Sequence, residues 1–111
     1  MFKTVLTPVH DVDAVKPVWT ALLGEPTNDD SYYVGWSLDG QEVGLVPNGH
    51  QQGLVGPTPY WQVDDIAATS AALVAAGGSE KQAPMDVGGG RLVALVTDAE
   101  DNLLGLMQDP S

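Results

Sequence analysis

Apolar and polar residues alternate in two similar series along the chain. Residues 4–24 predict a strand followed by a helix, and residues 58–78 predict the same pair with equivalent residues 54 positions further on. Four elements recur in the same order, ending with the matched segments 43–45 and 104–106. This order indicates an internal repeat of one structural module.

Both predicted helices begin after an aspartate. Asp11 or Asp13 is expected to cap the first helix and Asp65 the second, because an aspartate side chain accepts the unpaired N–H groups of a first turn. In the first helix, apolar residues recur at the spacing of one face. We expect that face to be buried through Val15, Val18, Trp19 and Leu22.

Strands follow each predicted helix. Residues 31–38 and 41–46 flank Asp39-Gly40, a two-residue hairpin signal, and residues 91–97 and 102–108 flank an expected four-residue turn. A further strand is expected at residues 80–84, whereas its counterpart in the first half is poorly defined. The sequence predicts one α+β domain, residues 1–111, with repeats 1–46 and 58–111 joined by a Gly/Pro/Asn-rich linker, 47–57.

Composition narrows the range of functions. Fifteen acidic residues against four basic ones give a net charge of −11, which argues against binding to nucleic acid or to a membrane surface. The absence of cysteine excludes disulfides and Cys-ligated metal sites. The first residues show neither a signal-peptide pattern nor a long apolar run, so we expect a cytoplasmic protein.

Three motifs carry a family resemblance: Val9-His10-Asp11-Val12-Asp13, Val63-Asp64-Asp65-Ile66, and the turn and strand at residues 98–106. In their order and spacing they resemble the vicinal oxygen chelate superfamily, which includes glyoxalase I, extradiol dioxygenases, fosfomycin-modifying enzymes and bleomycin-resistance proteins. The resemblance covers essentially the whole chain. It implies two βαβββ modules whose curved sheets form a cup, with the helices on the convex face.

The resemblance also implies where a metal would be held, on the first and last strands of each module. Those positions fall at Thr4, Gly44, Thr58 and Gly105. Two threonines and two glycines do not supply the three imidazole or carboxylate ligands of a catalytic metal. We therefore expect a metal-free cup without a cofactor.

Strand alternation predicts which side chains line that cup. In the first hairpin Gly44 should lie opposite Gly35, and in the last hairpin Gly105 opposite Ala94. The predicted ligand-binding residues are Tyr33, Ser37, Glu42, Thr58, Tyr60, Gln62, Leu92, Leu103 and Met107. Trp19 and Trp61 are expected in the core, whereas the sequence leaves open whether Trp36 faces the cup or the core.

Three functions remain open at this stage. The first is a small-molecule-binding protein that sequesters an aromatic or antibiotic-like ligand; we expect a homodimer, as the resemblance implies, under this and both other functions. The second is an enzyme, either a metal-dependent lyase, isomerase or dioxygenase with an unrecognised site, or a metal-free enzyme with Glu42 as general base. The third is an interaction module without a ligand. The small residues at Gly35, Gly44, Ala94 and Gly105 either make room for a flat ligand or let the sheet curve.

Overall fold

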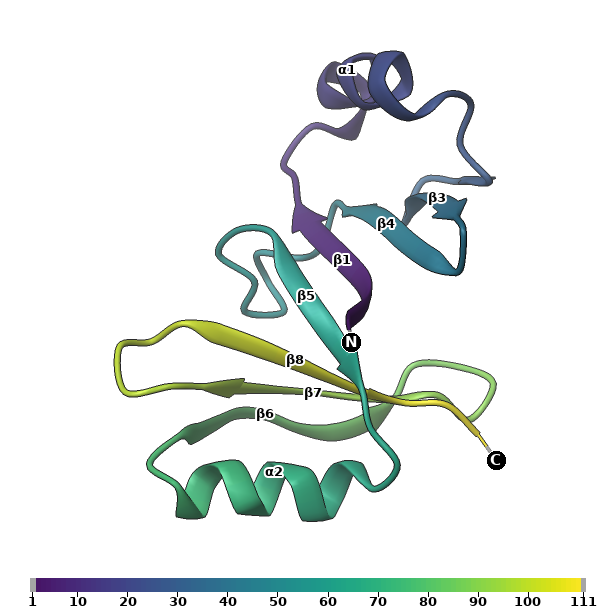
Figure 1. Cartoon of the computed structure of the whole chain (residues 1–111). Helices are drawn as coiled ribbons and strands as arrows, with labels where there is room; N and C mark the ends of the chain where they lie inside the picture. Colours follow the sequence, from purple (N-terminus) through teal and green to yellow (C-terminus); the bar gives the residue numbers. More distant parts are fainter. Residues whose placement is uncertain (1, 111) are drawn as a thin grey trace. The chain divides into compact units, whose positions relative to one another are not determined.

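The computed structural model describes residues 2–110, which form two compact units (Figure 1). The first unit holds Lys3–Thr58, and the second runs from Pro59 onward and includes Phe2. Each unit pairs one helix with one group of strands. Neither of the two helices in the described residues has the length and apolarity needed to span a membrane.

The first unit contains β1 (Phe2–Pro8) from Lys3 onward, α1 (Val12–Leu23), β2 (Asn28–Asp29), β3 (Val34–Leu38) and β4 (Gln41–Val46), in the sheet order β2-β3-β4-β1. β1 runs parallel to β4, and β3 and β4 form the hairpin predicted from Asp39-Gly40. Gly35 lies opposite Gly44, as the sequence predicts, and the same register places Ser37 opposite Glu42. The poorly defined strand of this half is the two-residue β2.

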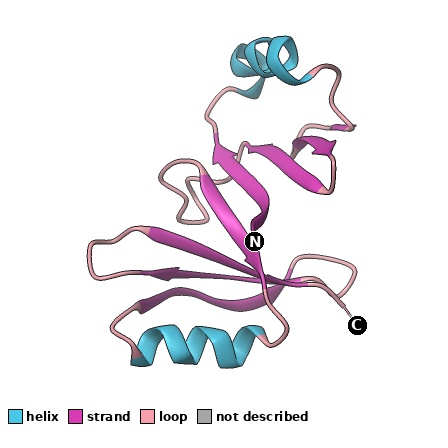
Figure 2. Ribbon diagram, viewed as in Figure 1, coloured by secondary structure: helices cyan, strands magenta, loops and turns pink. Residues whose placement is uncertain are grey.

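The second unit contains β5 (Thr58–Gln62), α2 (Ile66–Ala75), β6 (Ser79–Asp86), β7 (Leu92–Thr97) and β8 (Leu103–Gln108), in the order β5-β8-β7-β6 (Figure 2). Its first strand is again parallel to its last. Leu6 lies beside Gly44 in the first unit, and Tyr60 lies beside Gly105 in the second. These pairs are equivalent in the predicted repeat, so the α+β fold of two similar modules is confirmed.

The helix caps are those that the sequence predicts. The Asp11 side chain accepts a hydrogen bond from the Ala14 N–H at 3.2 Å, and the Asp65 side chain accepts one from Ala68 at 3.1 Å. Of the two aspartates that precede α1, Asp11 is therefore the cap.

The predicted buried face of α1 is partly wrong. Val18 and Leu22 are 72% and 75% exposed. Two of the four predicted residues belong to the packed face, but α1 contacts the buried core residues of β3 and β4 at the spacing i, i+3, i+7 and i+11. The packed residues are Val12, Val15, Trp19 and Leu23.

Each unit has its own core on the helix side of its sheet. In the first unit Trp36 is 1% exposed and its indole N–H donates to the Gly24 carbonyl at 2.8 Å, so Trp36 faces the core. The second core contains Ile66, Ala94, Val96 and Leu106, with Val63, Leu73 and Leu92 packed against it. Trp61 was expected in a core, but it is 37% exposed and meets Phe2 edge-to-face.

The register predicted for the last hairpin is wrong by one residue. Asp98 N–H donates to the Asn102 carbonyl at 3.1 Å, so the loop holds three residues rather than four. Asp101 adopts φ 65°, as the last residue of such a loop does. Gly105 therefore lies opposite Leu95 instead of Ala94.

Candidate functional site

The side of each sheet opposite its helix, called here the open face, carries most of the strand residues predicted to bind a ligand. In the first unit Trp36, Val43 and Leu45 pack toward α1, so the alternating Gly35, Ser37, Glu42 and Gly44 lie on the open face. Ser37 and Glu42 are directly opposite each other on neighbouring strands. The strand pairing thus brings a hydroxyl beside a carboxylate.

The Tyr33 ring covers both glycines of this face. A Cβ atom at Gly35 would lie 2.9 Å from Tyr33 Cζ, and one at Gly44 would lie 2.6 Å from the Tyr33 hydroxyl. The ring is brought there by a tight turn, in which the Asp30 carboxylate accepts the N–H groups of Tyr32 and Tyr33 at 2.8 Å each. The absence of side chains at Gly35 and Gly44 therefore makes room for a ring of the same chain.

A hollow of about 240 Å³ lies beside this ring and is called here the Tyr33 hollow. The Ser37 N–H donates to Thr27 Oγ1 at 3.0 Å, which holds the segment before β2 against the end of β3. The hollow brings together three predicted ligand-binding residues: Tyr33, Ser37 and Glu42. Its full lining is Thr27, Asn28, Tyr33, Gly35, Trp36, Ser37 and Glu42.

Sequence reasoning missed Thr27 and Asn28. They belong to a short segment whose strand has only two residues, too few for alternation to be visible. The turn residues Pro26, Asn28 and Asp29 were the signal that the chain bends there.

In the second unit the glycine of the last strand is also covered by a ring, that of Tyr60 in the neighbouring strand β5. A Cβ atom at Gly105 would lie 2.6 Å from Tyr60 Cγ, so the ring packs directly over this glycine. Tyr60 is 5% exposed, and burial raises the pKa of its phenol to about 12. It is a packed side chain that stays neutral at ordinary pH.

The other predicted residues of the second half do not line the Tyr33 hollow. Thr58 is buried, and its hydroxyl donates to the Gly56 carbonyl at 2.9 Å. Leu103 and Met107 alternate with the core residue Leu106 and lie on the open face, whereas Gln62 is exposed next to Asp109. Leu92 was expected to face the cup with the other predicted ligand-binding residues, but the corrected register turns it toward the core under α2.

The positions where the resemblance implies metal ligands do not fit a catalytic metal. Thr4 and Thr58 offer hydroxyls, and Gly44 and Gly105 lie under tyrosine rings. Within residues 2–110 no three His, Cys, Asp or Glu side chains lie close enough to hold an ion. His10 and His50 stack face to face, with centroids 4.0 Å apart and planes 3° apart, so their in-plane lone pairs do not converge on one point.

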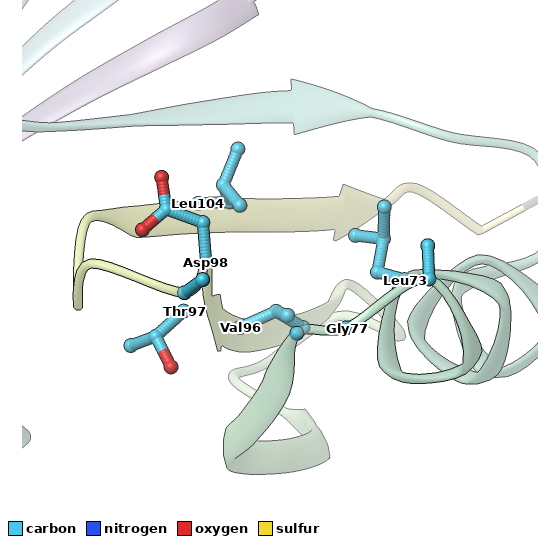
Figure 3. A pocket seen from close by; sticks show the side chains of 9 residues that line it. Leu73, Gly77, Val96, Thr97, Asp98 and Leu104 are labelled. Carbon is cyan, nitrogen blue, oxygen red and sulfur yellow. The ribbon is translucent and has the colours of Figure 1, made fainter.

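A second hollow, of about 220 Å³, opens on the helix side of the second unit between the end of α2 and the last hairpin (Figure 3). Leu73, Val96 and Leu104 give it an apolar wall, and Asp98 stands at its edge. A hydrogen bond from the Asn102 side chain, helped by backbone N–H groups of Asn102 and Glu100, lowers the pKa of Asp98. None of the residues predicted to bind ligand lines this hollow.

Comparison with known proteins finds no matching family model and no matching curated protein. Among solved structures, a glyoxalase/bleomycin resistance protein/dioxygenase superfamily member from Vibrio splendidus 12B01 is similar, with a TM-score of 0.71, 20% identity, and coverage of 96% of this chain and 97% of that one. The chain has the glyoxalase/bleomycin-resistance fold.

Two further solved structures share this glyoxalase-type fold. An Mn(II)-bound glyoxalase from Novosphingobium aromaticivorans matches with a TM-score of 0.70 and 19% identity, over 97% of this chain and 38% of that one. A Legionella pneumophila protein described as an NAD-dependent benzaldehyde dehydrogenase matches with a TM-score of 0.74 and 16% identity, over 96% and 98%. Identities this low establish the common fold alone.

Proposed function

We propose that the protein binds a small molecule in the Tyr33 hollow, as a metal-free member of the glyoxalase/bleomycin-resistance type. The observation that carries the proposal is the meeting of Tyr33, Ser37 and Glu42 around one hollow. An aromatic surface with a few placed polar groups is the usual composition of a small-molecule site. The ligand class we propose is aromatic or antibiotic-like, with a flat portion against the Tyr33 ring.

Binding without turnover accounts for this lining better than catalysis does. A lone carboxylate would have to act as both the general base and the general acid of a reaction. Glu42 is the sole carboxylate of the hollow, and no histidine or lysine lines it within the described residues. The metal-dependent alternative has no fitting ligand set at Thr4, Gly44, Thr58 and Gly105.

A thermal-shift screen of aromatic compounds and antibiotics tests this function. A ligand at 100 times its dissociation constant should stabilise the fold by about 2.7 kcal/mol. Tyr33→Ala should abolish the response to any hit. Tyr32→Ala is the matched control, because Tyr32 is adjacent, 74% exposed and outside the hollow.

Two results would contradict the proposal. The first is a panel in which no compound stabilises the protein. The second is a hit whose stabilisation is equal in Tyr33→Ala and Tyr32→Ala, since binding would then take place away from the hollow.

A further inference from the structure

Besides the Tyr33 ring, one charged side chain and several polar side chains line the Tyr33 hollow. Glu42 is its sole charged residue, and no Lys or Arg lines it within the part of the chain that the structure describes. The remaining polar side chains are the hydroxyls of Thr27 and Ser37 and the amide of Asn28, all of which can accept hydrogen bonds. The hydroxyls and the amide can also donate, so the Glu42 carboxylate, which only accepts, is the group that favours a ligand with N–H donors.

The spacing of these acceptors is set by the sheet. Ser37 and Glu42 are directly opposite on antiparallel strands, so their Cβ atoms are about 5 Å apart. One planar group with N–H donors on two edges spans such a distance. A carboxylate accepts two parallel N–H bonds from a planar amidinium or guanidinium, and these charge-assisted bonds are about twice as strong as neutral ones.

The aromatic ring favours the same ligand. Tyr33 is half-buried over Gly35 and Gly44 and also lines the hollow beside Ser37 and Glu42. A cation near the face of a tyrosine ring is attracted by the ring quadrupole. At long range the net charge of −11 attracts cations and repels anions.

We infer that the Tyr33 hollow selects a planar cation of the amidinium or guanidinium class attached to an aromatic group, through the paired Ser37 and Glu42 beside the Tyr33 ring. This inference rests on the proposed binding function and specifies its ligand class. The planar cation donates to the Glu42 carboxylate and the Ser37 hydroxyl, while the aromatic group lies against Tyr33.

Three probes of nearly the same shape and different charge test this selectivity. Benzamidinium is cationic, benzamide neutral and benzoate anionic, and each is titrated into the full chain while backbone amide shifts are followed by NMR. Benzamidinium should shift the amides of Gly35, Ser37 and Gly44 and bind at least tenfold more tightly than benzamide. Benzoate should bind most weakly.

Two variants with the same change of charge provide the control. Glu42→Gln should remove the tenfold preference for benzamidinium. Glu25→Gln should keep it, because Glu25 is an exposed residue of the same unit outside the hollow. An equal loss in both variants would overturn the inference, since it would show attraction to the net charge alone.

The remaining outcomes separate the inference from the function on which it rests. If benzamide binds as tightly as benzamidinium with shifts at the same amides, the hollow binds ligands but the preference for cations is wrong. If benzamidinium shifts none of these amides, the cation inference is overturned, and the thermal-shift panel with Tyr33→Ala decides the binding function separately.

Discussion

Tyr33 and Tyr60 cover the glycines of the two open faces. Tyr33 is half-buried beside a hollow, whereas Tyr60 is almost fully buried over Gly105. The same residue type therefore borders a hollow in one unit and is packed in the other. The two predicted site residues differ because only one keeps part of its ring accessible.

Burial of Tyr60 gives a prediction at alkaline pH. Its pKa is raised from 10.0 to about 12 in the folded protein, so unfolding favours the phenolate. The stability gained from keeping the phenol neutral is complete below pH 10 and is lost as pH rises toward 12. Tyr60→Phe should therefore remove part of the alkaline loss of stability, measured by denaturant unfolding across this range.

Ultraviolet absorbance provides the control for this prediction. Phenolate formation in the wild type should include a phase near pH 12 that is missing in Tyr60→Phe. If the two proteins show identical alkaline absorbance and stability curves, Tyr60 is not desolvated as described.

At the scale of elements, the last strand of each unit, β4 or β8, carries a glycine that is covered by a tyrosine ring. The two rings differ in how freely they can move. A Cβ at Gly44 meets the outer end of Tyr33, its hydroxyl and Cζ, which can swing toward solvent. A Cβ at Gly105 meets Tyr60 Cγ and, at 2.8 Å, the backbone carbonyl of Pro59. The collision in β8 cannot be relieved by rotating a side chain.

Alanine substitutions should reveal this difference. Gly105→Ala should destabilise the fold by about 3 kcal/mol, as overpacking of a tight core does. Gly44→Ala should cost about 1 kcal/mol or less and displace the Tyr33 ring. Denaturant midpoints measure the first effect, and increased quenching of tyrosine fluorescence by a soluble quencher measures the second. Equal destabilisation in both variants would contradict this account.

The two hairpins show what sequence could predict about these elements. Asp39-Gly40 allows one common turn, so the register of β3 and β4, and with it Ser37 beside Glu42, followed from the sequence. The sequence of residues 98–101 is compatible with a loop of three or four residues. The positive φ of Asp101 belongs to the three-residue loop, and an aspartate at this position does not by itself predict a positive φ. A loop shorter by one residue changes the register of the hairpin, and Leu92 therefore faces the core instead of the open face.

The packed face of α1 and the position of the Tyr33 ring could be predicted from the sequence only in part. Val15 and Trp19 pack as predicted, but tertiary contacts with Trp36 and Leu45 select Val12 and Leu23 over Val18 and Leu22. The candidate site residues Tyr33, Ser37 and Glu42 followed from alternation. That Tyr33 itself fills the space above the glycines depends on the Asp30 turn, which pattern alone does not reveal.

At the scale of the whole molecule, charge opposes folding. Fifteen acidic residues and four basic ones are confined to 111 residues, and self-repulsion is greater in the compact state than in the unfolded chain. The ion pairs Lys16–Asp29 and Arg91–Asp109 are both partly exposed and contribute little against it.

Added salt should therefore stabilise this protein. Raising sodium chloride from about 0.01 M to about 0.15 M shortens the screening length from about 30 Å to about 8 Å, which weakens the repulsion, so the melting temperature should rise by several degrees. Calorimetry measures the shift. Near the isoelectric point of about 4.1 the same addition should have little effect, and an equal rise at both pH values would contradict repulsion as the cause.

The glycines under the tyrosine rings also have a consequence for engineering. Placing a carboxylate at Gly44 or Gly105 to recreate a metal ligand would drive the new side chain into a ring. A designer would have to change two residues together in each half, Gly44 with Tyr33 and Gly105 with Tyr60. Because Tyr33 precedes β3 while Tyr60 lies within β5, the two halves would need different redesigns despite their repeated fold.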